Sequence, residues 1–358
     1  MIKRVVWIVL GVLVVGAGLS YQLAMGRIDA ALHAPMSEVP SEEVLEVKKG
    51  TSLRRLLVGL EERGLVPSAQ EAYLALRYTR WRQGSIPMPK AGEFEIDTSW
   101  SLMKLLAQLE AGKVKTYTVT IPEGLRVGEI VARLGAHELL DEKSLRALTR
   151  DDGLADQLKL PQLPRRVVGH PNAERFEGWL FPTTYTFTRS TRERDLIIQM
   201  VGQTRAVLEE PEIAAKAKAL GWSQAQVLSM ASVVEKETGK ASERPIISGV
   251  FHNRLRQGIK LETDPTIIYG IVGYDGNIRR KHIRMPHPWN CYVHHGLPAT
   301  PIAAAGRAAI EAAVNPQATK ALFFVSRNDG SHVFCPTLRC HRAAVNKWQI
   351  QYFKKKRR

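Results

Sequence analysis

Residues Ala231–Thr238 read ASVVEKET, and the segments Val250–Leu255 and Thr263–Gly270 follow as VFHNRL and TDPTIIYG. Acids, amides and an arginine occur there among apolar residues that would otherwise form a core. Burying such polar groups is unfavourable unless they are paired, so their density indicates the lining of a cleft. A carboxylate in that setting is a candidate catalytic acid.

The spacing of apolar residues predicts a helix over residues 224–236, with Ser223 as its N-cap. The buried stripe of this helix consists of Val227, Leu228, Ala231 and Val234. Glu235 falls on the same side at the C-terminal end, where the helix dipole disfavours negative charge. Burial and the dipole would both raise the pKa of its carboxyl group, as a general acid working near neutrality requires.

Glu237 lies two residues further on and therefore on nearly the opposite face of the helix. Ion pairing is the ordinary role of such a side chain. We expect Glu237 to be a structural support that pairs with Arg244 or Lys236. Arg244 is the second expected support of the site.

Asn253, Arg254 and Asp264 are placed at the expected ends of secondary-structure elements. An amide, a guanidinium and a carboxylate are suited to hydrogen-bond sugar hydroxyls and acetamido groups. Aromatic rings that could stack on sugar faces are Tyr269, Trp289 and Tyr292. An Arg254–Asp264 ion pair that holds a turn is the alternative interpretation.

Motifs of other reaction classes are missing. The sequence has no HExxH motif, no Cys/His cluster, no Gly-x-Ser-x-Gly and no glycine-rich phosphate loop, so we expect neither a metal nor a cofactor. The three cysteines are Cys291, Cys335 and Cys340. Free buried thiols are the simpler interpretation, and a Cys335–Cys340 bridge is the alternative. Acid–base chemistry by a carboxylate remains.

The chain has 358 residues and a formal charge of +16, from 51 Lys and Arg against 35 Asp and Glu. That length predicts two or three domains, and the charge predicts a polyanionic neighbour such as nucleic acid, anionic lipid or an acidic wall polymer. No charged residue occurs between Arg4 and Arg27, and a helix over 5–26 would span roughly 33 Å. A membrane anchor with a cytoplasmic N-terminus follows from the positive-inside rule, so the remainder and its charge face lipid and wall rather than nucleic acid. A cleaved signal peptide is the alternative.

A short internal sequence repeat, called the echo below, follows the anchor. Val47–Leu60 aligns with Ile121–Leu134, glycine on glycine, and each copy predicts a strand, a glycine turn and a helix. The first copy resembles the LysM family of glycan-binding modules, and amphipathic helices on a small sheet are the alternative. The predicted fold class is α+β, with an N-terminal transmembrane helix, small LysM-like α/β modules and a mixed α+β catalytic domain. The expected segments are a cytoplasmic start at 1–4, the anchor at 5–26, a linker at 27–46, a LysM-like domain at 47–115, a helical connection with the second echo at 116–170, the catalytic domain at 171–350 and a basic tail at 351–358.

Further motifs extend over roughly residues 170–345. They are Glu177–Phe187, the three segments quoted first, Arg244-Pro245, Asn290–Tyr292, Gly296–Ile302, Asn315-Pro316 and Phe323–Val325. In this order they resemble the YceG-type endolytic murein transglycosylases, the YceG/MltG family. The resemblance implies a single-pass inner-membrane protein whose periplasmic domain cuts nascent glycan strands in cell wall assembly, with peptidoglycan synthases as possible partners.

The resemblance also implies that Glu235 is catalytic. Candidate substrate-binding residues on the matched motifs are Glu177, Asn253, Arg254, Asp264, Tyr269, Asn290, Tyr292 and Thr300. Such enzymes break the bond between N-acetylmuramic acid and N-acetylglucosamine without water, leaving a 1,6-anhydro end, which would terminate glycan elongation. Glu262 or Asp264 as a second carboxylate would instead favour a hydrolysing muramidase. A peptidoglycan-binding scaffold without catalysis is the other alternative.

Overall fold

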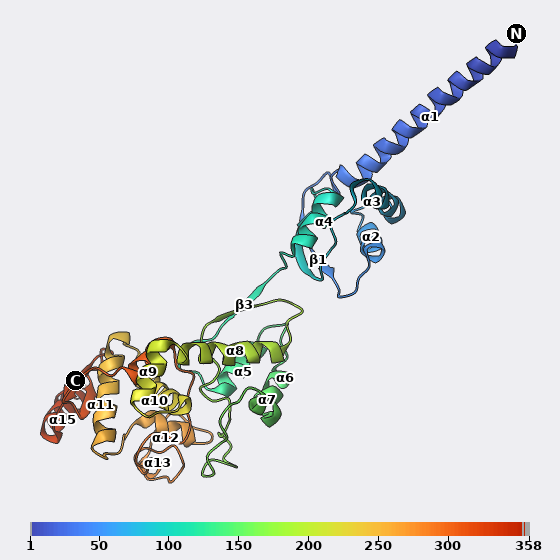
Figure 1. Ribbon diagram of the computed structural model, residues 1–358. Coiled ribbons are helices and arrows are strands. Elements are labelled where there is room, and N and C mark those ends of the chain that lie inside the picture. The colour runs from blue at the N-terminus through green and yellow to red at the C-terminus, as the bar shows by residue number, and fades with distance from the viewer. Residues whose placement is uncertain (1, 353, 355–358) are drawn as a thin grey trace. The chain divides into compact units, whose positions relative to one another are not determined.

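The computed structural model describes residues 2–352 and 354, and the chain forms two compact units (Figure 1). The first unit contains the chain before Thr118 together with Thr186–Ser190. The second contains Thr118–Tyr185 and the chain from Thr191 onward. The segment 186–190 therefore returns to the first unit from within the second.

The first unit is built around a strand–helix–helix–strand order. Its elements are α1 (Ile2–His33), β1 (Glu42–Val47), α2 (Leu53–Glu62), α3 (Ala69–Gln83), β2 (Gly92–Asp97) and α4 (Leu102–Ala111). β1 pairs antiparallel with β2, so that Val47 lies opposite Gly92. Serines that precede α2, α3 and α4 accept hydrogen bonds from backbone N–H groups of the first turn, as expected of N-caps.

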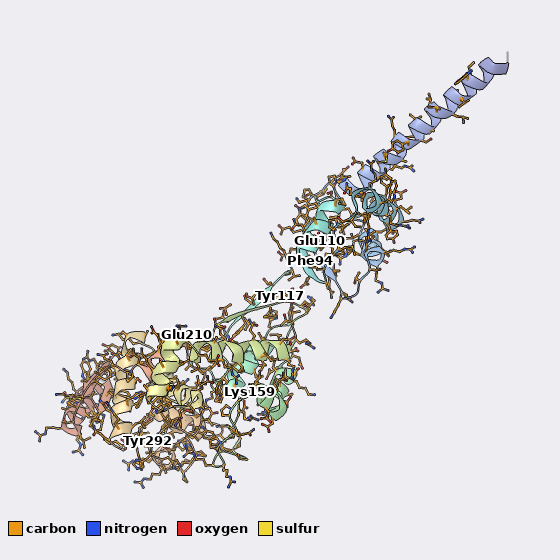
Figure 2. All side chains as sticks on the ribbon, viewed as in Figure 1. Phe94, Glu110, Tyr117, Lys159, Glu210 and Tyr292 are labelled. Carbon is orange, nitrogen blue, oxygen red and sulfur yellow. A yellow bond between two sulfur atoms is a disulfide. The ribbon has the colours of Figure 1, made fainter. Side chains whose placement is uncertain are left out.

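The core of the first unit lies between the two-stranded sheet and its helices. Phe94, labelled in Figure 2, projects from β2 into this core and is 2% exposed. The helices contribute mainly leucines, among them Leu57, Leu60, Leu76, Leu105 and Leu106. Burial of each such side chain stabilises the fold by about 1.5–3 kcal/mol before the loss of conformational entropy is subtracted.

The N-terminal helix is longer than the sequence predicts. α1 continues to His33 and β1 begins at Glu42, so the linker expected at 27–46 is wrong over 27–33 and over 42–46. Leu32 is buried in the core of the first unit. Met36 then donates a backbone hydrogen bond to the Trp100 carbonyl at 3.0 Å, which ties the following turn to the same unit. Within the described residues, Leu10–His33 is long and apolar enough to cross a membrane.

The second unit begins with short elements. They are β3 (Tyr117–Thr120), α5 (Val127–Gly135), α6 (Glu142–Leu148), α7 (Asp152–Gln157), β4 (Thr184–Phe187), α8 (Glu193–Leu208) and α9 (Pro211–Ala219). β3 and β4 form a two-stranded sheet. The helix expected for the second echo is present as α5, whereas the strand β3 ends one residue before the echo begins at Ile121. Gly124, in the turn between them, has φ +78°, a conformation that favours glycine.

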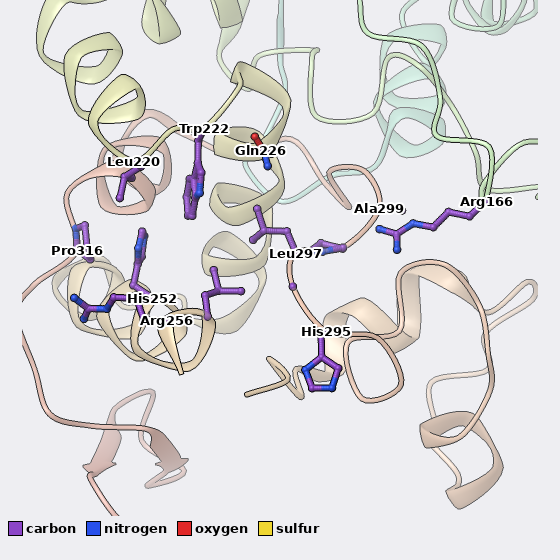
Figure 3. A pocket seen from close by; sticks show the side chains of 13 residues that line it. Arg166, Leu220, Trp222, Gln226, His252, Arg256, His295, Leu297, Ala299 and Pro316 are labelled. Carbon is purple, nitrogen blue, oxygen red and sulfur yellow. The ribbon is translucent and has the colours of Figure 1, made fainter. Parts of the chain in front are cut away.

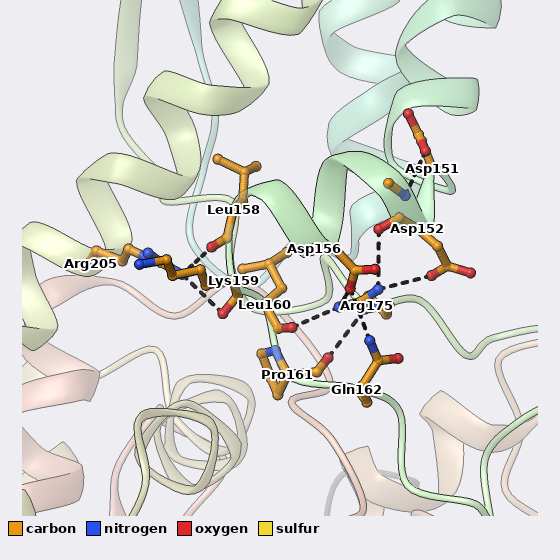
Figure 4. Close-up of polar contacts among 11 residues, drawn as sticks. Asp151, Asp152, Asp156, Leu158, Lys159, Leu160, Pro161, Gln162, Arg175 and Arg205 are labelled. Atoms are coloured by element: carbon orange, nitrogen blue, oxygen red, sulfur yellow. Dashed lines mark hydrogen bonds and ion pairs between the residues drawn. The ribbon is translucent and has the colours of Figure 1, made fainter.

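The segment after α7 is held by two arginines (Figure 4). The buried Arg175 donates to the Leu160 carbonyl at 2.7 Å and pairs with Asp152 at 3.2 Å and Asp156 at 2.8 Å. Arg205 of α8 donates to the carbonyls of Leu158 and Lys159. Because a loop without regular structure must satisfy its carbonyls elsewhere, these contacts fix residues 158–161 against the helices.

The rest of the second unit is mainly helical. Its elements are α10 (Gln224–Glu237), the 3₁₀ turn η1 (Ala241–Glu243), α11 (Arg244–Arg256), α12 (Asp264–Gly270), α13 (Arg280–Ile283), α14 (Arg307–Val314), β5 (Phe323–Ser326), β6 (His332–Cys335), α15 (Leu338–Val345) and the π-helical turn η2 (Asn346–Gln351). α10 packs against α11, α12 and α14. The mixture of helices with small two-stranded sheets confirms the predicted α+β class.

The simpler interpretation of the cysteines is wrong, because Cys335 and Cys340 form a disulfide. Cys335 ends β6 and Cys340 lies in the first turn of α15, which brings their Cα atoms to 5.5 Å. That separation is ordinary for a bridge. Cys291 is the free, buried cysteine.

Candidate active site

The helix that carries Glu235 forms as predicted. Ser223 accepts a hydrogen bond from the N–H of Gln226, whose side chain accepts one from the N–H of Ser223, so a capping box begins α10. All four residues of the predicted stripe are buried. Glu235 occupies the last turn, and its side chain is only 5% exposed.

The Glu235 carboxylate has a fixed set of partners. Arg244 Nη2, at the start of α11, donates to Oε1 at 2.7 Å, and the backbone N–H of Gly306 donates to Oε2 at 3.1 Å. Burial raises the pKa of Glu235 and is the largest cause of its shift; the Gly306 N–H opposes it, the charge of Glu123 raises the pKa further, and Arg244 lowers it. Glu235 therefore keeps a proton to higher pH than an ordinary Glu, as the sequence pattern predicted.

Glu123 is the acid of the site that the sequence did not reveal. It belongs to the turn between β3 and α5, and its Oε2 accepts a hydrogen bond from Arg244 Nη2 at 3.0 Å. Its side chain is 43% exposed, in contrast to Glu235. The sequence shows only that Glu123 precedes Gly124 in the echo, a position that predicts a turn.

The turn that carries Glu123 is fixed from two sides. Gly124 donates to the Ala304 carbonyl at 2.8 Å, and Ala304 donates to the Leu125 carbonyl at 2.8 Å. Lys236 of α10 donates to the Gly124 carbonyl at 3.0 Å. These bonds align the segment 302–306 with the turn, so that one glycine, Gly306, meets both acids.

Gly306 leaves no room for a side chain. A Cβ at this position would lie 1.7 Å from Oε1 of Glu123. Its N–H at the same time bonds Glu235, since Gly306 is the N-cap of α14 and this N–H is one of the groups that a helix leaves unpaired. The sequence thus uses glycine where two carboxylates approach the backbone.

Glu237 has a different partner from the one expected. Thr263, the N-cap residue of α12, donates its hydroxyl hydrogen to Glu237, while Arg244 and Lys236 are engaged elsewhere. Burial raises the pKa of Glu237 to about 7, and the charge of Asp264 raises it as well. Tyr292 donates to Oδ1 of Asp264 at 2.8 Å, so Glu237, Asp264 and Tyr292 form a second polar group around the start of α12.

Asn253 and Arg254 are buried and bonded inside the protein. Asn253 Nδ2 donates to the carbonyls of Thr319 and Ala321, at 2.8 and 2.9 Å. Arg254 donates to the Lys260 and Leu322 carbonyls and pairs with Glu262. The Arg254–Asp264 ion pair of the alternative interpretation is therefore wrong, because Glu262 takes the place of Asp264.

The remaining predicted residues are buried, except for Thr300, which is partly exposed. Tyr269 bonds Glu177, and both are almost completely buried. Asn290 Nδ2 donates to the Met285 carbonyl at 2.8 Å, and Trp289 Nε1 donates to Thr300 Oγ1 at 2.8 Å. Trp289 is fully buried, so its ring is not available to stack on a sugar.

A cavity of about 770 Å³ opens near the other end of α10 (Figure 3). Trp222, whose ring stacks on His252, lines it together with Leu297 and the cations Arg166 and Arg256. None of the acids described above lines this cavity. Glu235, in the last turn of α10, is therefore not part of this cavity.

A model of the YceG-like family matches residues 45–347. The chain belongs to this family. The match begins within β1, includes α2, α3, β2 and α4 of the first unit, and includes the site at the end of α10, which agrees with the family resemblance found in the sequence.

Named relatives of this YceG-like chain are bacterial. The endolytic murein transglycosylase of Bacillus subtilis is 31% identical over 264 residues, which are 72% of this chain and 73% of the relative. The endolytic murein transglycosylase of Streptococcus pneumoniae strain D39 is 28% identical over 78% of this chain, which spans about half (53%) of that relative. A crystal structure of a putative YceG-like protein from Listeria monocytogenes shares the fold, with a TM-score of 0.57 at 24% identity over 84% of this chain and 98% of that one.

Proposed function

We propose that this protein is an endolytic murein transglycosylase in which Glu235 is the reacting acid and base. The observation that carries the proposal is the buried carboxyl group at the end of α10, held by Arg244 and the Gly306 N–H. Its raised pKa suits proton transfer near neutrality. Relatives named for this activity support the proposal.

The proposed reaction needs no water. Protonated Glu235 gives its proton to the oxygen that leaves with N-acetylglucosamine, as the bond from that oxygen to C1 of N-acetylmuramic acid breaks. The 6-hydroxyl oxygen of the muramyl residue then bonds to C1, and its proton goes to the Glu235 carboxylate. One carboxyl group is thus regenerated, and the product is a 1,6-anhydro end.

Neighbouring groups have separate parts in this proposal. Arg244 and the Gly306 N–H orient the Glu235 carboxyl group and stabilise its ionised form between the two proton transfers. Asp264 is exposed and Tyr292 partly exposed, so they are the accessible candidates for contact with sugar. The buried candidates, Glu177, Asn253, Arg254, Tyr269 and Asn290, position the loops of the site, as does the partly exposed Thr300.

The surrounding functions belong to the same proposal. The helix Leu10–His33 would anchor the protein in the inner membrane with its N-terminus in the cytoplasm, and the net charge of +16 would favour anionic lipid and wall polymer. The strand–helix–helix–strand part of the first unit would bind glycan as a LysM-like module. Cleavage of nascent strands would end their elongation beside peptidoglycan synthases.

The test is product analysis by mass spectrometry after full-length protein in detergent is incubated with peptidoglycan. We expect anhydro-ended fragments from the wild type and a loss of about 10²- to 10⁴-fold in rate for Glu235→Gln. Glu129→Gln is the matched control, because Glu129 is an exposed acid that only caps α5. Products with reducing ends would show a hydrolysing muramidase, and intact glycan would show a binding scaffold.

A further inference from the structure

Two carboxylates share one guanidinium nitrogen at this site. Arg244 Nη2 donates to Glu235 at 2.7 Å and to Glu123 at 3.0 Å. The two acids are 112 positions apart in the sequence, yet both also touch Gly306. Proton transfer by Glu235 requires only one of them, so the second acid needs an explanation.

The explanation lies in the burial of Arg244. Its side chain is 10% exposed, and its Nε has no hydrogen-bond partner. When Glu235 is protonated, Arg244 loses one of its two counter-charges. A buried guanidinium without a partner is strongly unfavourable, so a protonated Glu235 is accessible only if another anion remains on the arginine.

We propose that Glu123 is a positioning residue that neutralises Arg244 whenever Glu235 carries its proton, and so permits Glu235 to act as the acid. This inference rests on the proposed transglycosylase function. It assigns Glu123 no contact with the reacting atoms: it acts through Arg244. In the ionised state of Glu235 the arginine is shared, and on protonation it is held by Glu123 alone.

The other charged groups around Glu235 have partners of their own. On α10, Lys236 bonds the Gly124 carbonyl and Glu237 accepts from Thr263. On α12, Asp264 accepts from Tyr292. On α14, Arg307 pairs with Glu210 and Glu311, and Gly306 contributes only its N–H. Arg126, beyond the Glu123 turn, lies over the Tyr269 ring at 4.9 Å. Among the described residues, Arg244 and Glu123 are therefore the charges that set the proton affinity of Glu235.

The sign of the effect follows directly. The negative charge of Glu123 raises the pKa of Glu235, so its removal lowers that pKa. The alkaline limb of the pH profile, where kcat/KM falls as Glu235 loses its proton, should move to lower pH. We expect the loss of a like charge that shares the Arg244 guanidinium to move the limb by roughly one unit, which corresponds to about a tenfold lower rate above the limb.

The experiment measures kcat/KM for release of anhydro-ended fragments against pH with full-length protein in detergent. In Glu123→Gln the amide oxygen still accepts from Arg244 while the charge is lost, and we expect the limb to move down by roughly one unit. Glu123→Asp, which keeps the charge, should restore the limb toward that of the wild type. Glu129→Gln, which removes an exposed acid of α5 that does not bond Arg244, should leave the limb in place.

Gly306→Ala is a second variant in which Arg244 would lose the Glu123 carboxylate. Its backbone conformation suits alanine, but the new Cβ would displace the Glu123 side chain from Arg244. This variant should shift the limb in the same direction even if Glu123→Gln does not fold. An unmoved limb in the folded variants, or an equal shift in Glu129→Gln, would overturn the role of Glu123.

The experiment also distinguishes a failure of the proposed transglycosylase function from a failure of the proposed role of Glu123. A wild type that yields no anhydro ends would overturn both proposals before any Glu123 variant is compared. An active wild type with an unmoved limb in Glu123→Gln overturns only the present one.

Discussion

The hydroxyl of Tyr269 lies 3.0 Å from Oε2 of Glu177, and both side chains are almost completely buried. The same hydroxyl is 2.7 Å from the Asn172 carbonyl, although a tyrosine has a single hydrogen to donate. A proton on Glu177 completes the pair of hydrogen bonds. Burial raises the pKa of Glu177 to about 8, so the neutral carboxyl group is the form that fits the interior.

Glu177→Gln should therefore make stability less dependent on pH. The folded-state pKa of Glu177 is raised above its unfolded value, so the stability it contributes is complete below about pH 4 and is lost as the pH rises to about 8. Over this pH range the wild type loses on the order of 3–5 kcal/mol of its free energy of unfolding. Glutamine does not titrate, so the variant should not show this loss. Thermal unfolding at pH 5 and pH 8.5 checks this: the variant should gain in melting temperature over the wild type at pH 8.5. An equal pH dependence in both proteins contradicts a neutral Glu177, and Glu129→Gln should behave as the wild type does.

Tyr292→Phe tests the accessible side of the site. Tyr292 donates to Asp264 at 2.8 Å, and these two residues are proposed to meet the sugar. Loss of one hydrogen bond costs about 1 kcal/mol, which predicts a KM higher by roughly fivefold with kcat little changed. Steady-state kinetics on glycan strands measure KM and kcat of this variant, with Tyr78→Phe in the first unit as control. A kcat that falls while KM stays constant would place Tyr292 in the chemistry instead.

Local patterns predicted much of the site. The Ser223 N-cap, the apolar stripe and the position of Glu235 all follow from residues within fifteen positions of one another. Glu123 could not be found in this way, because its partner Arg244 is 121 positions away and the turn carries no chemical motif. The site thus depends on one local and one distant acid.

For the predicted sugar-binding residues, prediction from the sequence is limited in a different way. Asn253 and Arg254 have side chains suited to sugars, but the same groups also satisfy backbone carbonyls. Their acceptors, at Thr319, Ala321 and Leu322, lie 66 to 68 positions away. Residue type alone does not distinguish a donor aimed at a ligand from one that holds a distant loop.

The disulfide gives a prediction that needs no activity. Denatured, unreduced protein should take up one iodoacetamide group, at Cys291, and reduced protein should take up three. Intact mass measures both states. Closing so short a loop should contribute about 2 kcal/mol, so reduction should also lower the melting temperature of the second unit. Three labels without reduction would show that the bridge is absent from the isolated protein.

Arg244→Gln should shift the alkaline limb in the direction opposite to that expected for Glu123→Gln. Arg244 lowers the pKa of Glu235, so its loss raises that pKa and moves the limb to higher pH, by one unit or more. The rate should fall at every pH because Glu235 loses its main partner, and stability should fall as well, by about 3–5 kcal/mol.

Arg307→Gln is the matched control for Arg244→Gln, since Arg307 follows Gly306 in the chain but pairs with Glu210 and Glu311. The alkaline limb of Arg307→Gln should lie at the same pH as that of the wild type. Opposite shifts at Arg244 and Glu123 cannot come from general damage to the fold, which would lower the rate without moving the limb in a charge-dependent direction. A downward shift in Arg244→Gln would instead mean that the acid titrating in this limb is not Glu235.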